Sequence, residues 1–167
     1  FRRALPGADL GRVVLLGAGG AGSAIADAVL RLGAEHLRIV DVDHNRAHAL
    51  AEALRTRFGA RVVAQNDAAQ ALADATGLIH ATPTGMAKMP GLPIPAKLLR
   101  RSMWVSEVVY FPIETALLKA ARAAGCPTMD GGAMAVGQAI GAFELFTGLK
   151  ADPARMEQHF RKLLTAR

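Results

Sequence analysis

Apolar and polar positions alternate in blocks along the chain, and each block predicts one strand or one helix. Short runs of consecutive apolar residues, such as VVLLG at 13–17, are typical of parallel strands that are buried on both faces. Between such runs, apolar residues recur three or four positions apart, as at Ile25, Val29 and Leu32, which predicts amphipathic helices. Strands that alternate with helices indicate a parallel sheet covered on both sides.

The pattern predicts strands at residues 13–17, 36–42, 61–65, 77–82, 103–110 and 126–130. It predicts helices at residues 22–33, 45–59, 67–75, 112–125, 133–148 and 152–166, with a short helix after the Pro/Gly-rich loop 89–95. Gly33 and Gly59 stand at predicted helix ends, and Asp67 stands at a predicted N-cap. We therefore expect one α/β domain over residues 1–167: a doubly wound, Rossmann-like parallel sheet of about six strands.

Composition narrows the classes of protein that remain. At 167 residues and 51% hydrophobic, the chain is long enough for one well-buried core, and no apolar run approaches the ~20 residues that span a bilayer. The net charge is +6, but no aromatic residues interleave with the short basic clusters, which disfavours nucleic-acid binding. The single cysteine, Cys126, fits a reducing cytoplasm, and no cluster has metal-ligand spacing.

The first predicted strand runs directly into a G-x-G-x-x-G motif, a pattern found at dinucleotide sites. The first glycine allows a tight turn, the second lets the backbone approach a pyrophosphate, and the third lets the helix lie close to the strand. The following helix presents free N–H groups to the phosphates. The predicted cofactor loop is Gly17, Ala18, Gly19, Gly20, Ala21 and Gly22.

An acidic residue ends the next predicted strand, as the dinucleotide motif requires. Asp41 lies 24 positions after Gly17 and is expected to accept hydrogen bonds from the ribose hydroxyls of adenosine. A 2′-phosphate at this place would meet the carboxylates of Asp41 and Asp43, so the sequence favours NAD over NADP. Arg46 is the residue that opposes this interpretation, because it could turn toward a phosphate.

With these segments in place, the chain resembles the cofactor-binding domain of the shikimate/quinate dehydrogenase family. The resemblance covers residues 1–160 and rests on GAGGAG (17–22), ATPTGM (81–86), VVYFPIETALLKAA (108–121) and DGGAMAVGQAIGAFELFTG (130–148). Most shikimate dehydrogenases of this family use NADP and carry Asn-Arg-Thr where this chain has Asp-Val-Asp at 41–43. This departure resembles the NAD-dependent quinate/shikimate branch.

The resemblance also implies roles for residues outside the glycine motif. The turn at 81–85 is expected to line the diphosphate and the nicotinamide ribose, and Gly131 and Met134 are expected to border the nicotinamide. Further cofactor contacts are implied at Thr82, Pro83, Thr84 and Val108, and substrate contacts at Tyr110 and Gln138. His80 stands where the family usually has Asn.

The implied function is that of an oxidoreductase domain that transfers a hydride between NAD and quinate or shikimate, yielding the 3-dehydro forms. Such a protein serves the shikimate pathway of aromatic amino acid biosynthesis or quinate metabolism. In the family, a Lys–Asp pair from an N-terminal substrate domain takes the proton. The usual family chain has an N-T-D motif just before a Gly-Phe, and the resemblance aligns Phe1 of this chain with that Phe. We therefore expect no catalytic residue within these residues, and cofactor binding with slow turnover or none.

Two other interpretations remain open at this stage. One is a stand-alone NAD-binding regulatory module, which belongs to a different functional class. The other is the cofactor domain of another two-domain dehydrogenase, such as the methylenetetrahydrofolate or glutamyl-tRNA reductase families, although Gln138 in its DGGAM context argues against these. A homodimer and a preference between quinate and shikimate are also left open.

Overall fold

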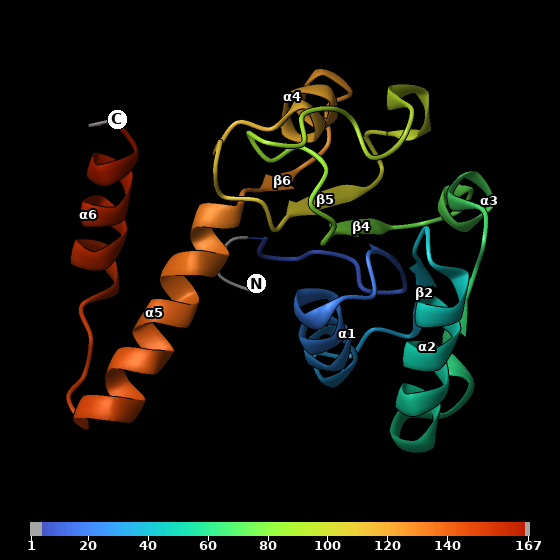
Figure 1. Cartoon of the computed structure of the whole chain (residues 1–167), viewed down its shortest axis with the longest axis horizontal. Helices are drawn as coiled ribbons and strands as arrows, with labels where there is room; N and C mark the ends of the chain where they lie inside the picture. Colours follow the sequence, from blue (N-terminus) through green and yellow to red (C-terminus); the bar gives the residue numbers. More distant parts are fainter. Residues whose placement is uncertain (1–4, 166–167) are drawn as a thin grey trace.

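Six parallel strands form the centre of the structure, a computed structural model that describes residues 5–165. The expectation of a preceding substrate domain rests on Phe1, which lies outside the described residues. The strand order is β3-β2-β1-β4-β5-β6, with helices on both faces (Figure 1). After β3 the chain crosses over to the other side of β1, which makes the sheet doubly wound and confirms the predicted Rossmann-like fold class.

The strands are β1 (Arg12–Leu16), β2 (His36–Val40), β3 (Val62–Ala64), β4 (Gly77–His80), β5 (Trp104–Glu107) and β6 (Thr128–Met129). The α-helices are α1 (Gly20–Arg31), α2 (His44–Phe58), α3 (Ala68–Leu72), α4 (Ala116–Ala123), α5 (Gly131–Thr147) and α6 (Pro153–Thr165). Two 3₁₀ turns, η1 (Gly59–Arg61) and η2 (Ala96–Leu98), complete the order. Every predicted strand and helix is present.

Several predicted boundaries differ from the structure by two to four residues, and two of them have a clear physical cause. The helix predicted from residue 112 begins at Ala116, because Thr115 accepts a hydrogen bond from Leu118 N and thereby caps the helix. The strand predicted to reach residue 110 ends at Glu107, whose carboxylate accepts hydrogen bonds from the next two backbone N–H groups. In both cases a polar side chain bonds to nearby backbone and ends the regular structure. The Asp67 N-cap and the positive φ of Gly59 agree with the sequence.

Alternate residues of the central strand supply the two halves of the core. Val13 and Leu15 pack with buried residues of α1 and α2, while Val14 and Leu16 pack with α3 and α4. All four side chains are almost completely buried, as expected for a strand covered on both faces. Cys126 lies in the second half of the core, where burial raises the pKa of its thiol.

Helix α1 approaches β1 so closely that no side chain fits between them. A methyl group in place of the Gly22 hydrogen would lie 2.0 Å from the Gly17 carbonyl oxygen. Gly17 has a φ of 103°, in the region that glycine adopts most readily. The third glycine of the motif thus allows the close contact between helix and strand that was expected from the sequence.

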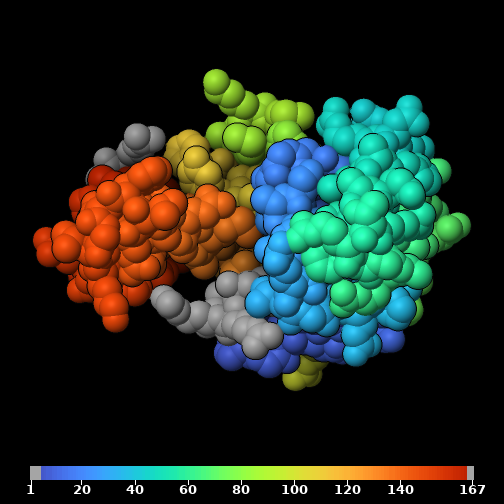
Figure 2. Space-filling model, turned by 90° about the horizontal axis from the view of Figure 1, so that it is seen from below, coloured from blue at the N-terminus to red at the C-terminus, as the bar shows by residue number. Residues whose placement is uncertain are grey.

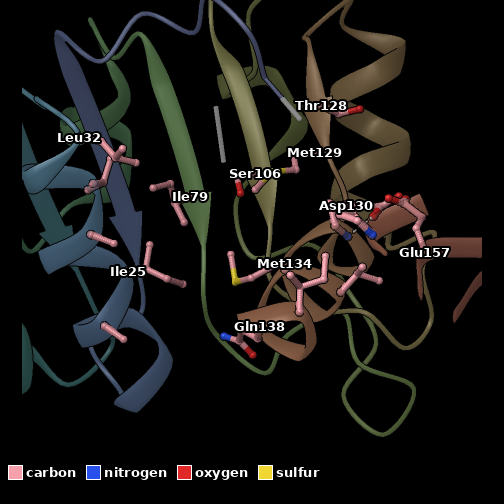
Figure 3. A pocket seen from close by; sticks show the side chains of 18 of the residues that line it. Ile25, Leu32, Ile79, Ser106, Thr128, Met129, Asp130, Met134, Gln138 and Glu157 are labelled. Atoms are coloured by element: carbon pink, nitrogen blue, oxygen red, sulfur yellow. Dashed lines mark hydrogen bonds between the residues drawn. The ribbon is translucent and has the colours of Figure 1, made fainter. Parts of the chain in front are cut away.

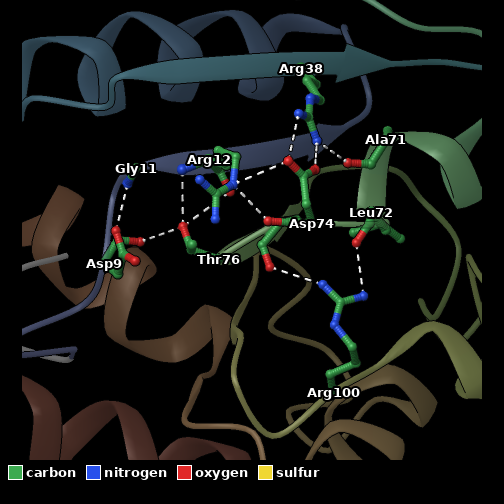
Figure 4. A network of polar contacts seen from close by, with 10 residues as sticks. Asp9, Gly11, Arg12, Arg38, Ala71, Leu72, Asp74, Thr76 and Arg100 are labelled. Atoms are coloured by element: carbon green, nitrogen blue, oxygen red, sulfur yellow. Dashed lines mark hydrogen bonds and ion pairs between the residues drawn. The ribbon is translucent and has the colours of Figure 1, made fainter.

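Arginine side chains stabilise the carboxyl end of the short helix α3 (Figure 4). Arg38 donates to the Ala71 carbonyl at 2.8 Å, and Arg100 donates to the Leu72 carbonyl at 2.9 Å. Arg38 also bonds to the carboxylate of Asp74, which lowers the pKa of that group. These bonds satisfy carbonyls that a five-residue helix leaves without partners.

Helix α5 starts at the sheet and leads away from it, and α6 returns beside α5 (Figure 1). Asp130 caps α5 through Ala133 N, and its carboxylate pairs with Arg161 of α6 at 2.9 Å. This pair raises the pKa of Arg161 and fastens the two helices together near the sheet. Within residues 5–165, no helix has the length and apolar character that a membrane crossing needs.

The close contact at the glycine turn predicts a cost for the smallest possible side chain. Gly22→Ala is expected to lower the free energy of unfolding by about 1–3 kcal/mol, as overpacking does. Gly20→Ala is the matched control, since a methyl group there meets nothing within 4 Å. Urea denaturation measures both variants, and equal stability of the two would contradict the packing role of Gly22.

The lowered pKa of Asp74 predicts a pH-dependent contribution to stability. Because Arg38 favours the ionised form in the folded state, this contribution is present above pH 4 and is lost as pH falls through the lowered pKa. The side chain is about half exposed, so Asp74→Asn is expected to cost only about 0.5–1 kcal/mol at pH 7. Urea denaturation at pH 7 and pH 3 should show a smaller difference from wild type at the lower pH; a constant difference would argue against the ion pair.

Candidate functional site

Two turns face each other where the strand order reverses, at the carboxyl ends of β1 and β4. A methyl group on Gly17 would lie 2.6 Å from the Ala81 carbonyl oxygen and 3.0 Å from the Thr82 methyl group. The glycine turn and the turn at 81–85 are therefore neighbours, although they lie over sixty residues apart in sequence. Ligands of open α/β sheets bind at such a switch point.

The N-terminus of α1 differs from those of the next four helices. Asp43, Asp67, Thr115 and Asp130 cap α2, α3, α4 and α5 through side-chain oxygens. Helix α1 starts after Gly19 with no side-chain cap, and methyl groups on Gly19 or Gly20 would meet nothing within 4 Å. Its first N–H groups therefore remain available to an anionic group that approaches the backbone.

Asp41 is buried at the end of β2 and is bonded to the glycine turn. One carboxylate oxygen accepts from Ala18 N at 2.7 Å, and the other accepts from Asp43 N at 2.9 Å. Only 9% of the residue is exposed. Each oxygen keeps a second lone pair, so the carboxylate can still accept from a hydroxyl. Asp41 thus fixes the glycine turn, a role that the sequence did not indicate.

Arg46 lies one turn into α2 and is paired with the residue that caps this helix. Its guanidinium is 3.5 Å from the Asp43 carboxylate, and its backbone N–H donates to the same side chain at 3.2 Å. Both side chains are about half exposed. Arg46 is therefore held by a carboxylate, and turning toward a phosphate would require it to leave that partner.

A buried polar pair lies beneath the second turn and was missed by sequence reasoning. His80 at the end of β4 and Glu107 at the end of β5 are both fully buried, with Nδ1 and Oε1 2.8 Å apart. Glu107 also accepts from the Thr115 hydroxyl at 2.9 Å. The available signal was a carboxylate that ends an apolar strand, as Asp41 does. No role had been assigned to Glu107 or Thr115.

The start of α5 packs directly on the segment that follows β5. A methyl group on Gly131 would lie 2.5 Å from the Val108 carbonyl oxygen and 2.3 Å from that of Val109. Two residues implied at the nicotinamide, Val108 and Gly131, are therefore brought together by the fold. Tyr110 lies two residues further on and is about half exposed.

Two further residues implied by the resemblance, Met134 and Gln138, line a cavity on the α1 face of the sheet. This cavity of about 740 Å³ lies between α1, α5, α6 and the sheet, where the space-filling view is hollowed (Figure 2). Met134 and Gln138, one turn apart on α5, line it together with Ser106 of β5 (Figure 3). The buried Ser106 hydroxyl has no hydrogen-bond partner in the described part of the chain.

The cavity and the glycine turn are separate parts of the predicted site. The cavity is not lined by residues 17–22, Asp41 or Thr82, and it shares only Met134 and Gln138 with the predicted contacts. Thr82 lies beside the glycine turn, and Pro83 and Thr84 follow it in the chain. Among residues 5–165, no group of three or more His, Cys, Asp or Glu side chains is arranged to hold a metal ion.

The chain matches the family described as alanine dehydrogenase/PNT, C-terminal domain, over residues 3–106. Shikimate dehydrogenase (NADP(+)) of Streptomyces avermitilis is 56% identical over 159 residues, which cover 93% of this chain and 55% of that relative. Quinate/shikimate dehydrogenase (NAD(+)) of Corynebacterium glutamicum is 46% identical over 162 residues, covering 95% and 57%. The chain thus spans about half the length of the curated relatives it matches.

A solved structure shares the fold closely. Quinate dehydrogenase from Corynebacterium glutamicum, in complex with NAD, is 44% identical with a TM-score of 0.92, covering 96% of this chain and 58% of that chain. A shikimate dehydrogenase from Thermus thermophilus, in complex with NADP(H) and shikimate, is 35% identical with a TM-score of 0.81, covering 93% and 57%. The chain therefore belongs to the alanine dehydrogenase/PNT C-terminal domain family, and its predicted membership of the shikimate/quinate dehydrogenases is confirmed.

Proposed function

We propose that the chain is the NAD-binding domain of an oxidoreductase that interconverts quinate or shikimate and their 3-dehydro forms. The observation that carries this proposal is the uncapped N-terminus of α1 in the glycine turn, which faces the turn at 81–85. The backbone there is free of side chains and offers N–H groups, as the diphosphate of a dinucleotide requires. When bound, NAD supplies the hydride acceptor for oxidation of a secondary alcohol.

The glycine turn and the turn at 81–85 border a crevice, and the residues present there fit a dinucleotide. The glycine turn would hold the diphosphate, and the Asp41 carboxylate would accept from the ribose hydroxyls of adenosine. Thr82 would face the distal ribose, which is the ribose that carries the nicotinamide. Val108 beside Gly131 would border the nicotinamide itself. Tyr110 and Gln138 would contact the substrate; the Gln138 amide can both donate to and accept from a polyol.

The preference for NAD over NADP is a finer part of the proposal. The relatives named above include an NADP(+) enzyme and an NAD(+) enzyme, so similarity alone does not decide it. The support is local: Asp41 and Asp43 place two carboxylates at the end of β2, and the nearby cation Arg46 is already paired with Asp43. A 2′-phosphate would be repelled by the two carboxylates. It would also have to compete with Asp43 for the guanidinium of Arg46.

The proton acceptor for alcohol oxidation is proposed to come from outside these residues. None of the five lysines lines the cavity, and the matched relatives are nearly twice as long as this chain. We propose that a substrate domain supplies the Lys–Asp pair that the family resemblance implies. A cytoplasmic location is proposed as well, supported by the free, buried Cys126.

Cofactor choice can be tested at Asp43 without uncapping α2. Asp43→Ser removes one carboxylate and frees Arg46, while serine retains the capping oxygen. We expect wild type to bind NAD more tightly than NADP in calorimetric titrations. In Asp43→Ser, the ratio of the NADP to the NAD dissociation constant is expected to fall about fivefold, equivalent to about 1 kcal/mol.

Two controls make that titration specific. Adding Arg46→Ala to Asp43→Ser is expected to reverse the gain for NADP, because the freed cation is lost. Asp152→Ser changes the same residue type at the start of α6, where Asp152 accepts from Arg155 N, and should leave the ratio unchanged. Equal affinity of wild type for both dinucleotides would overturn the carboxylate explanation.

The origin of the proton acceptor is tested by turnover. Residues 1–167 are expected to bind NAD but to give no steady reduction with quinate or shikimate, measured by absorbance of the reduced nicotinamide. A rate near 10 per second, typical of enzymes, would show that the acceptor lies within these residues. Binding of NAD by the same preparation is the control that separates missing chemistry from misfolding.

A further inference from the structure

We propose that the buried pair His80–Glu107 fixes the Thr82 hydroxyl as a hydrogen-bond acceptor toward the ligand, so that Thr82 meets a ribose hydroxyl of the dinucleotide and not a phosphate oxygen. His80 and Glu107 are positioning residues in this proposal, since they act through Thr82. The inference rests on the proposed function, because it requires a dinucleotide in the crevice.

The first step concerns the protonation of Glu107. Its carboxylate accepts from Val108 N at 2.9 Å, from Val109 N at 3.0 Å and from the Thr115 hydroxyl at 2.9 Å. Thr115 Oγ1 in turn accepts from Leu118 N, so its hydrogen is directed at Glu107. A carboxyl group surrounded by donors is ionised, because a protonated one would need an acceptor of its own.

The second step fixes the tautomer of His80. Its Nδ1 lies 2.8 Å from Glu107 Oε1, which has no hydrogen to donate, so Nδ1 carries the ring hydrogen. Both side chains are fully buried, and three other donors bond to the Glu107 carboxylate. The proposal requires the neutral ring with a bare Nε2, because a ring with hydrogens on both nitrogens would donate to Thr82 as well.

The third step follows the single hydrogen of Thr82. Nε2 of His80 lies 2.5 Å from Thr82 Oγ1 and, lacking a hydrogen, must accept the hydroxyl hydrogen. Thr84 N donates to the same oxygen at 3.3 Å and takes one lone pair. A hydroxyl has one hydrogen and two lone pairs, so Thr82 retains one lone pair for the ligand. A ribose hydroxyl can donate to that lone pair, whereas a diphosphate oxygen cannot.

Comparing two ligands separates these contacts. ADP-ribose retains the distal ribose, and ADP ends at the diphosphate. Thr82→Val is expected to weaken ADP-ribose about five- to tenfold in calorimetric titrations, while ADP changes by less than twofold. Thr82→Ser is expected to restore the affinity for ADP-ribose. Equal weakening of both ligands, or of neither, would overturn the inference.

His80→Asn tests the positioning role itself. An asparagine amide can still donate to Glu107 but lacks the acceptor at the place of Nε2, so the Thr82 hydrogen is released. In this background, Thr82→Val is expected to weaken ADP as well as ADP-ribose. Unchanged discrimination between the ligands would show that His80 does not set the direction of the Thr82 hydrogen bond. Thermal unfolding of each variant verifies that it is folded.

The tautomer can be read directly in the wild-type protein, without a ligand. Long-range ¹H–¹⁵N correlation spectra of histidine-labelled protein distinguish the two ring nitrogens, and loss of one set of signals in His80→Asn assigns this residue. We expect a hydrogen on Nδ1 alone; a hydrogen on Nε2 overturns the inference. If wild type binds neither ADP nor ADP-ribose, the proposed function itself fails, and this inference fails with it.

Discussion

The arrangement of the site depends on one close contact, between the third glycine of the motif and the carbonyl of the first. Because Gly22 has no side chain, α1 lies directly against the end of β1, and its first N–H groups open onto the crevice. Any larger residue would push the helix away and displace those groups. The neighbouring turn at 81–85 packs against the same glycine turn. Both sides of the crevice therefore depend on the position of Gly17.

Much of this could be predicted from the sequence, because local patterns determine it. Buried parallel strands appear as apolar runs, and the glycine motif has the same spacing wherever a strand enters such a helix. The caps at Asp67 and Gly59 also follow from single residues. The start of α4 could not be predicted in the same way: Pro112 is suited to a first helical turn, but the Thr115 cap three residues later determines the boundary.

The buried pair beneath Thr82 could not be predicted, for a physical reason. His80 and Glu107 meet because β4 and β5 are neighbours in a register that places these two residues opposite each other. Register is a property of the assembled sheet, and neither residue carries a local signal of its partner. The separation of the cavity from the crevice could not be predicted either, because it depends on where α5 and α6 lie in the folded chain.

The two bonds made by Asp41 have a consequence for how cofactor preference can evolve. The Asp41 carboxylate accepts from Ala18 N in the glycine turn, and in the proposed function it also accepts from the ribose, so a residue there without a side-chain acceptor would loosen the turn. Val42, by contrast, is completely exposed, and its side chain does not hold the glycine turn. If cofactor preference is set here, changes in it should therefore begin at the solvent-facing positions after β2. At Asp41, the exchange expected to keep the bond to the turn is one to asparagine, whose amide oxygen can still accept from Ala18 N.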